Sequence, residues 1–300
     1  MGVGLALIYG AGCAERSFDV GESYYDESTL IDLPPSDYVA VPPLYGKDYF
    51  FEAIGQDYVS TSQLKEVSGM IVNHHDIASG MIARGYAELQ AKRPDLKTII
   101  VLGPNHTQMG DSYIASGRVF FETPQKQNVY IDHAFIEELE QKKLIGFESE
   151  IMQIEHSTAI QMPFIAYYFP NARVIPLIFQ ADYYSVHSQK IVNALYNYAI
   201  THEDVAIIAT VDFSHYLPTD LSNQKDRETI EYIKNWDTQT LLTFKDDHLD
   251  GRSTITAFMS LMQRLGATDI DVIDHKNSAD ILGRPLEVST GYYTILFGRK

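Results

Sequence analysis

Cysteine is almost absent from this chain of 300 residues, which has a single one at position 13. One cysteine cannot form a disulfide within the chain, and it cannot build a zinc site from several cysteine ligands. Any metal ion that the folded part of this protein binds must therefore be held by histidine, aspartate or glutamate side chains.

Positive charge is also scarce. The chain has 23 lysine and arginine residues against 40 aspartate and glutamate residues, which gives a formal net charge of -17. No lysine- or arginine-rich patch reverses this sign locally, so the composition argues against nucleic acid as a partner, whose phosphates would be repelled. No segment approaches the ~20 consecutive apolar residues of a membrane span, so only a covalent lipid could hold this chain at a membrane.

The N-terminal segment has a character of its own. Residues 1–13 (MGVGLALIYGAGC) are an apolar run that ends in small residues before Cys13, and they resemble the end of a bacterial lipoprotein signal peptide. Residues 14–45 are acidic, contain proline and lack periodicity, which predicts a disordered tether. We expect an extracytoplasmic protein that a lipid on Cys13 anchors to a membrane. The alternative is a cytoplasmic protein whose N-terminus is merely disordered.

The remaining residues, 46–300, alternate between short β-branched runs and amphipathic stretches. The main runs are GMIVNH (69–74), TIIVLGPNH (98–106), ARVIPLIF (172–179) and VAIIATVDFSH (205–215). Continuous apolar runs of this length are typical of strands that helices cover on both faces. The pattern predicts a single α/β domain with three layers, α/β/α, around a largely parallel or mixed sheet.

Histidines follow three of these predicted strands. His74 and His75 come directly after the first, His106 ends the second, and Asp212 and His215 end the fourth. Ligands of open α/β sheets bind beyond the carboxyl ends of the strands, so these side chains can converge although they are far apart in sequence. One such histidine alone would more often be a hydrogen-bonded turn residue, but three together favour a site.

Two further segments offer polar side chains near a helix start. In EHSTAIQMPF (155–164), Glu155 and His156 could face the site or could simply cap the helix, for which Ser157 or Thr158 could also serve. In DHLDGR (247–252), Asp250 precedes another predicted helix. Its carboxylate could be an N-cap, or it could be the anionic ligand that neutral imidazoles still lack.

The motifs together resemble the Memo family, whose bacterial members include AmmeMemoRadiSam system protein B. The motifs that carry the resemblance are GPNH, EHSTAIQMPF, VDFSHY, DGR and SADILGRPLEVSTGYY, and it extends from about residue 69 to the end. The family is similar in fold to the class III extradiol ring-cleaving dioxygenases. The resemblance therefore implies two histidines and one carboxylate on a non-haem iron, with a further histidine as acid and base.

Carried over residue by residue, the resemblance assigns His74 and His106 as metal ligands and the pair Asp212 and His215 as catalytic residues beside the metal. Where the family usually has Pro-His-Ala-Gly-Tyr, this chain has Asn-His-His-Asp at 73–76, so the choice of His74 over His75 is an inference. We expect His75, Glu155 and His156 elsewhere in the pocket, with Glu155 or Asp212 as the hydrogen-bond partner of His215.

Asp250 departs from the animal Memo proteins, which have cysteine at the corresponding place, and returns to a carboxylate as in the ring-cleaving dioxygenases. Two imidazoles and one carboxylate on one face of Fe(II) leave three positions for substrate and O₂. A thiolate would favour soft Cu(I), so aspartate favours Fe(II), with Mn(II), Zn(II) or copper as alternatives.

The leading hypothesis is a metal-dependent oxidoreductase of the extradiol dioxygenase-like type that acts on a small-molecule or peptide substrate. Two alternatives remain open at this level. With Zn(II) and one water, the same ligand set is a hydrolytic site in which His215 would be the base. The chain could also be a metal- or peptide-binding protein without catalytic activity.

Overall fold

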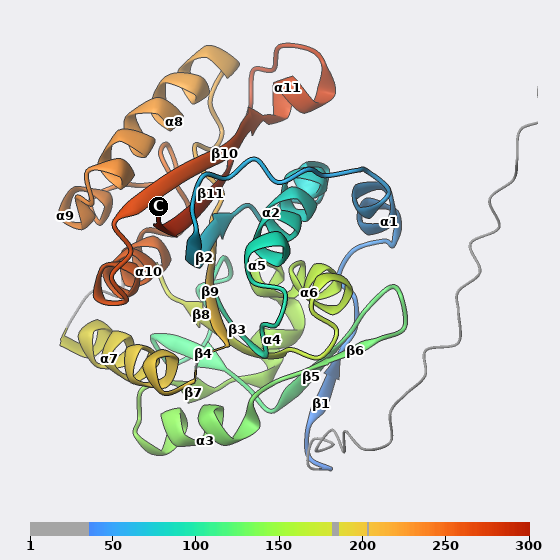
Figure 1. Cartoon of the computed structure of the whole chain (residues 1–300), viewed down its shortest axis with the longest axis vertical. Coiled ribbons are helices and arrows are strands. Elements are labelled where there is room, and N and C mark those ends of the chain that lie inside the picture. The colour runs from blue at the N-terminus through green and yellow to red at the C-terminus, as the bar shows by residue number, and fades with distance from the viewer. Residues whose placement is uncertain (1–35, 182–185, 203) are drawn as a thin grey trace, which may run out of the picture. The chain divides into compact units, whose positions relative to one another are not determined.

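A mixed sheet forms the centre of the computed structural model, which describes residues 36–181, 186–202 and 204–300 (Figure 1). In this part of the chain the sheet has eight strands, in the order β10-β11-β2-β9-β3-β8-β4-β7. They are β2 (Glu66–Val72), β3 (Thr98–Pro104), β4 (Ile114–Ser116), β7 (Gly146–Phe147), β8 (Arg173–Phe179), β9 (Val205–Thr210), β10 (Asp269–Asn277) and β11 (Gly291–Arg299).

The middle of this sheet is parallel. β2 pairs with β9, β9 with β3 and β3 with β8, all in the same direction. Every residue of β3 and β9 is buried, which explains why their sequences are uninterrupted apolar runs. β11 is antiparallel to both β10 and β2, and β4 is antiparallel to β8, so the sheet is mixed. The parallel pairing places the carboxyl ends of β2, β9 and β3 at one edge.

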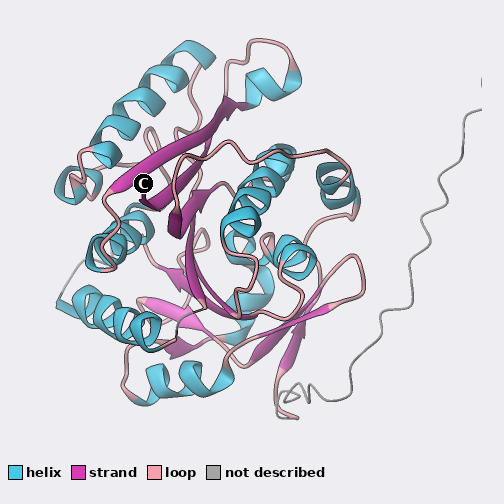
Figure 2. Ribbon diagram, in the orientation of Figure 1, coloured by secondary structure: helices cyan, strands magenta, loops and turns pink. Residues whose placement is uncertain are grey.

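Helices lie on both sides of the strands, as Figure 2 shows. On one side are α2 (Ser79–Lys92), α5 (His156–Ala159) and α6 (Met162–Tyr168), and on the other are α7 (Val186–Thr201), α8 (Thr219–Lys234) and α10 (Arg252–Arg264). α2 and α5 pack on β2 and β3, and α10 packs on β9 and β3. The predicted α/β fold with a mixed central sheet is confirmed.

The shorter elements include a second, smaller sheet that the sequence did not predict. It consists of β1 (Val39–Val41), β5 (Val119–Glu122) and β6 (Asn128–Tyr130), in the order β1-β5-β6. The remaining helices are α1 (Asp48–Ile54), a 3₁₀ turn η1 (Asp76–Ala78), α3 (His133–Gln141), α4 (Ser149–Ile154), α9 (Thr238–Leu241) and α11 (Ser278–Leu282).

β1 belongs to residues 14–45, for which the sequence predicted a disordered tether. Its backbone pairs in parallel with β5, and the side chain of Val41 is buried. The last part of that segment is therefore structured, because pairing with β5 satisfies its backbone groups and Val41 adds apolar contact. Residues 1–35, including the lipoprotein-like segment and Cys13, lie outside the described residues, so the lipid anchor stays a prediction. Within the described ranges no helix has the length and hydropathy needed to cross a bilayer.

Candidate metal centre

The strand order brings the predicted site residues together. β9 lies between β2 and β3, so the residues that follow these three strands leave the sheet at neighbouring points of the same edge. His74 follows β2, His106 follows β3 and Asp212 follows β9. The imidazole rings of His74 and His106 have centroids 4.9 Å apart and are nearly perpendicular.

Asp250 is the centre of this cluster. Its Oδ2 lies 2.9 Å from Nε2 of His74, 3.3 Å from Nε2 of His106 and 3.9 Å from Nε2 of His215. The N-cap of α10 is Gly251, so Asp250 is not used as the helix cap that the sequence also allowed. Three imidazole nitrogens thus face the carboxylate of Asp250, which does not cap α10.

The donor set fits a divalent cation. His74, Asp212 and Asp250 offer ligand atoms that all lie within 4.8 Å of one another, and so do His74, His106 and His156. Among the described residues, the buried Oδ1 of Asp250 and Nδ1 of His74 have no hydrogen-bond partner. Leaving a buried polar atom unpaired costs roughly 1–3 kcal/mol, and a bound cation would remove this cost for the carboxylate oxygen.

The electrostatics of the cluster also favour a cation. Burial alone lowers the pKa of His106, but hydrogen bonds to Asp250 and Glu155 outweigh it and raise this pKa to about 10. Burial likewise opposes protonation of His74, while Asp212 and Asp250 raise its pKa overall. Burial raises the pKa of Asp250, and the neighbouring imidazoles lower it by more. The carboxylates of Asp212, Asp250 and Glu155 therefore stabilise positive charge in the cluster. Without a metal ion, protonated imidazoles of His74 and His106 carry that charge.

Glu155 holds His106 in place. Its Oε2 accepts the backbone N–H of His106 at 2.7 Å, and its Oε1 lies 2.9 Å from Nδ1 of the same residue. Oε1 also accepts the N–H of Ser157 at 2.8 Å, so Glu155, and not Ser157 or Thr158, is the N-cap of α5. Burial raises the pKa of Glu155, but the contacts with His106 lower it to about 2, so the group is ionised. Because Nδ1 of His106 donates to Glu155, Nε2 is left to face Asp250.

His74 is positioned through the peptide group that precedes it. The N–H of His74 donates to Oδ1 of Asp212 at 2.9 Å. At the other end of the same peptide, the carbonyl of Asn73 accepts a hydrogen bond of 2.9 Å from Nε2 of Gln161. Gln161 is fully buried and was not singled out in the sequence. The carboxylate of Asp212 therefore contacts His74, while the hydrogen-bond partner of Nδ1 of His215 is the carbonyl of Phe213 and not the expected Asp212 or Glu155.

His75 lies outside the cluster. Its side chain is 45% exposed, and its Nδ1 lies 2.9 Å from Asp76 and accepts the N–H of Ile77. The ring therefore caps η1 and faces solvent, while His74 turns inward and is 1% exposed. The geometry favours His74 over His75 as a ligand.

His156 lies beside the cluster, but its ring is stacked on the ring of His106. The rings of His156 and His106 have centroids 4.4 Å apart and planes only 27° from parallel. An imidazole binds metal through a lone pair in the plane of its ring, so two stacked rings cannot both point at one ion without rotating. Burial and the charges of His74 and His106 lower the pKa of His156 to about 4, which leaves it neutral.

Tyr45 is a further residue beside the cluster that the sequence did not reveal. Its ring lies 6.3 Å from that of His156, and its pKa is raised to about 12 by burial and by the carboxylates of Asp76, Asp212 and Glu155. Tyr45 precedes α1, in a segment without periodicity, so only the tertiary structure could reveal this contact.

The cluster is accessible to solvent through His106 and His156, whose side chains are 31% and 32% exposed.

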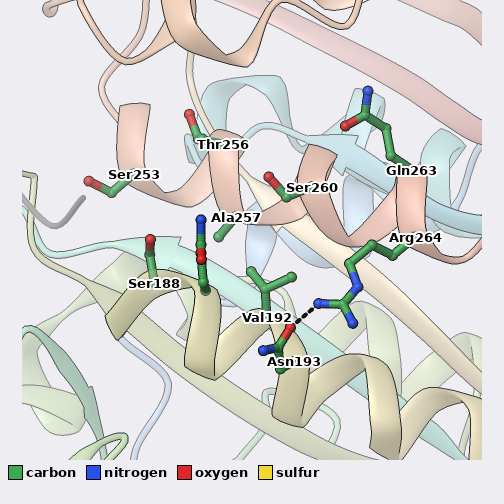
Figure 3. Close-up of a pocket in the computed structure, with 10 residues that line it drawn as sticks. Ser188, Val192, Asn193, Ser253, Thr256, Ala257, Ser260, Gln263 and Arg264 are labelled. Atoms are coloured by element: carbon green, nitrogen blue, oxygen red, sulfur yellow. Dashed lines mark hydrogen bonds between the residues drawn. The ribbon is translucent and has the colours of Figure 1, made fainter. Parts of the chain in front are cut away.

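A cavity of about 410 Å³ lies apart from this cluster, between α7 and α10 (Figure 3). Small polar side chains line it, and Arg264 of α10 donates a hydrogen bond to Asn193 of α7 across it. Its lining shares no residue with the His–Asp cluster.

Comparisons with known proteins point to one family. The model of the Memo-like protein family matches residues 50–296. A MEMO1 family protein from Caldivirga maquilingensis is 29% identical over 249 residues, which cover 79% of this chain and 87% of that protein. One from Saccharolobus solfataricus is 28% identical over 230 residues, covering 74% and 79%. The crystal structure of an uncharacterised protein from Escherichia coli K12 aligns with a TM-score of 0.49 at 12% identity, covering 78% of this chain and 100% of that one.

Proposed function

This chain belongs to the Memo family, and from that premise and the geometry of its His–Asp cluster we propose that it is a metal-dependent oxidoreductase of the extradiol dioxygenase-like type. The observation that carries the proposal is the convergence of His74 and His106 on Asp250, with Nε2 to Oδ2 distances of 2.9 and 3.3 Å. Two imidazoles and one carboxylate are the donors that non-haem Fe(II) oxygenases use.

Fe(II) is the proposed ion, and Mn(II), Zn(II) and copper are the alternatives. His74, His106 and Asp250 would hold this ion through two imidazole nitrogens and one carboxylate oxygen. The ion, when bound, would supply Lewis-acid and redox chemistry for a hydroxylated substrate and dioxygen. Glu155 and Asp212 contribute by fixing the orientations of His106 and His74.

His215 is proposed as the acid and base. Its Nδ1 donates to the carbonyl of Phe213 at 2.6 Å, so in the neutral ring Nε2 carries no proton. Nε2 faces Oδ2 of Asp250 at 3.9 Å, and the side chain is 13% exposed. A hydroxyl group of a substrate bound at the cluster could pass its proton to this nitrogen.

We predict that His215→Gln keeps the metal and the fold but lowers turnover by about 10²-fold or more, the usual size of a lost general acid or base. Metal content by mass spectrometry and oxygen consumption with any substrate that the wild type accepts would measure both effects. If His215 is a fourth ligand instead, metal content itself falls. If it is only structural, the melting temperature falls and residual activity follows the folded fraction.

The proposed function is tested by elemental analysis of anaerobically purified protein, followed by oxygen-consumption assays on catechols. We expect about one divalent ion per chain after loading with Fe(II), and oxygen uptake with at least one hydroxylated substrate. Tight binding of Zn(II) with ester or amide hydrolysis and no oxygen uptake would favour the hydrolase. Stoichiometric metal with no turnover would favour a binding protein, and failure to bind any of Fe(II), Mn(II), Zn(II) or copper would exclude the metal site.

A further inference from the structure

Another buried carboxylate, outside the His–Asp cluster, lies on α8. Asp226 is fully buried, and none of the proposed ligands contacts it. Its Oδ2 lies 2.8 Å from Nε2 of His275 on β10, and its Oδ1 accepts the N–H of Ser214 at 3.1 Å. A buried carboxylate requires such partners to offset the loss of water, and here one of the partners is a peptide group directly beside His215.

The chain leaves room for this carboxylate by having glycine at position 291. A Cβ atom there would lie 2.1 Å from Oδ2 and 2.4 Å from Oδ1 of Asp226, closer than atoms can approach. The same glycine pairs with the turn that Asp226 contacts, because its N–H donates to the carbonyl of Ser214 and its carbonyl accepts the N–H of Phe213. Glycine at position 291 thus leaves space for the carboxylate of Asp226, and its backbone holds the Phe213–Ser214 turn by two hydrogen bonds.

One peptide group links Asp226 to His215. The N–H of Ser214 and the carbonyl of Phe213 belong to the same planar peptide and point in opposite directions. Asp226 accepts from the N–H end, and Nδ1 of His215 donates to the carbonyl end at 2.6 Å. A charged acceptor on the N–H polarises the carbonyl and strengthens the bond that it accepts. A carbonyl oxygen can only accept, so this orientation of the peptide favours the neutral form of His215 with its proton on Nδ1.

We propose that Asp226 is a positioning residue, which holds the Phe213–Ser214 peptide so that His215 keeps its proton on Nδ1 and presents a free Nε2 to Asp250. The proposal rests on the proposed function only in assuming that the free Nε2 of His215 accepts a proton from the substrate. The competing explanation is that Asp226 and His275 form an ion pair that merely stabilises the packing of α8 against β10.

Three variants separate these explanations. Asp226→Ala removes the acceptor from Ser214. Asp226→Asn removes the charge but keeps an amide oxygen that can accept the same N–H. His275→Gln removes the ion pair and leaves the carboxylate on Ser214. If Asp226→Ala does not fold, Asp226→Leu takes its place, because it also removes the acceptor from Ser214 but keeps a side chain of similar length in the buried space.

The measurement is the ¹⁵N NMR spectrum of the imidazole of His215, assigned with His215→Gln and recorded at about pH 9, where an ordinary histidine is neutral. It is recorded in the metal-free and the Zn(II)-loaded protein, with zinc content and the unfolding midpoint determined for each variant. A protein that binds none of Zn(II), Fe(II), Mn(II) and copper would refute the proposed metal site, whereas the metal-free spectra still test the role of Asp226.

We expect the wild type to show one tautomer, with the proton on Nδ1. Asp226→Ala should lower the ratio of this tautomer to the other by about tenfold, the effect of losing one ordinary hydrogen bond. Asp226→Asn should restore much of it, and His275→Gln should keep it even where its unfolding midpoint falls. An unchanged tautomer in Asp226→Ala, or an equal change in His275→Gln, would overturn the proposal.

Discussion

Replacing Asp250 by alanine is expected to weaken the binding of a divalent ion by more than about 100-fold, because losing even an outer partner of a ligand typically costs 10–100-fold. Asp250 supplies the carboxylate on which the nitrogens of His74 and His106 converge, and its Oδ1 is buried without a partner among the described residues. Alanine would leave two neutral imidazoles, which neither balance the charge of the ion nor complete three ligands on one face.

The measurement is the metal content after loading and dialysis, together with titration against a competing chelator. Asp247→Ala is the matched control, since that carboxylate lies in the same loop but contacts Lys225 and His248 instead of the cluster. Asp250→Cys should still bind metal but shift its preference towards soft Cu(I). Normal stoichiometric binding in Asp250→Ala would remove this residue from the ligand set.

Replacing Glu155 by glutamine is the second change with a large expected effect. The carboxylate accepts N–H groups from the backbone and Nδ1 of His106 and from the backbone of Ser157. Glutamine has one acceptor oxygen and an amide that donates, so it cannot satisfy these three donors. The imidazole of His106 then loses its fixed orientation, and the cluster loses one negative charge. We expect the metal affinity to fall by about 10–100-fold, the usual cost of losing such a partner.

Chelator competition measures this change, and circular dichroism shows whether the fold is intact. Glu150→Gln, on the exposed surface of α4, removes the same charge nearby without touching His106 and should bind metal as the wild type does. Equal affinities for Glu155→Gln and Glu150→Gln would show that Glu155 only caps α5.

Several features of this fold follow from local patterns that can be read along the chain. The runs TIIVL and VAIIAT are uninterrupted because β3 and β9 are buried on both faces, and this burial is what their composition predicts. His74 and His106 could be located in a similar way, since each lies two residues after the end of a strand, β2 or β3. Local patterns say less about the beginning of the fold, where β1 exists only because β5 pairs with it.

The sequence by itself determined the α/β class, the strands and the residues at their carboxyl ends, because hydrophobic periodicity and strand ends are properties of neighbouring residues. Only the tertiary structure decided that β9 lies between β2 and β3, that Asp250 meets His74 and His106, and that His75 faces solvent. It also decided the contact of Asp226 with Ser214, to which α8, β10 and β11 all contribute. Such contacts join segments distant in sequence, and their partners are set by the packing of the whole sheet.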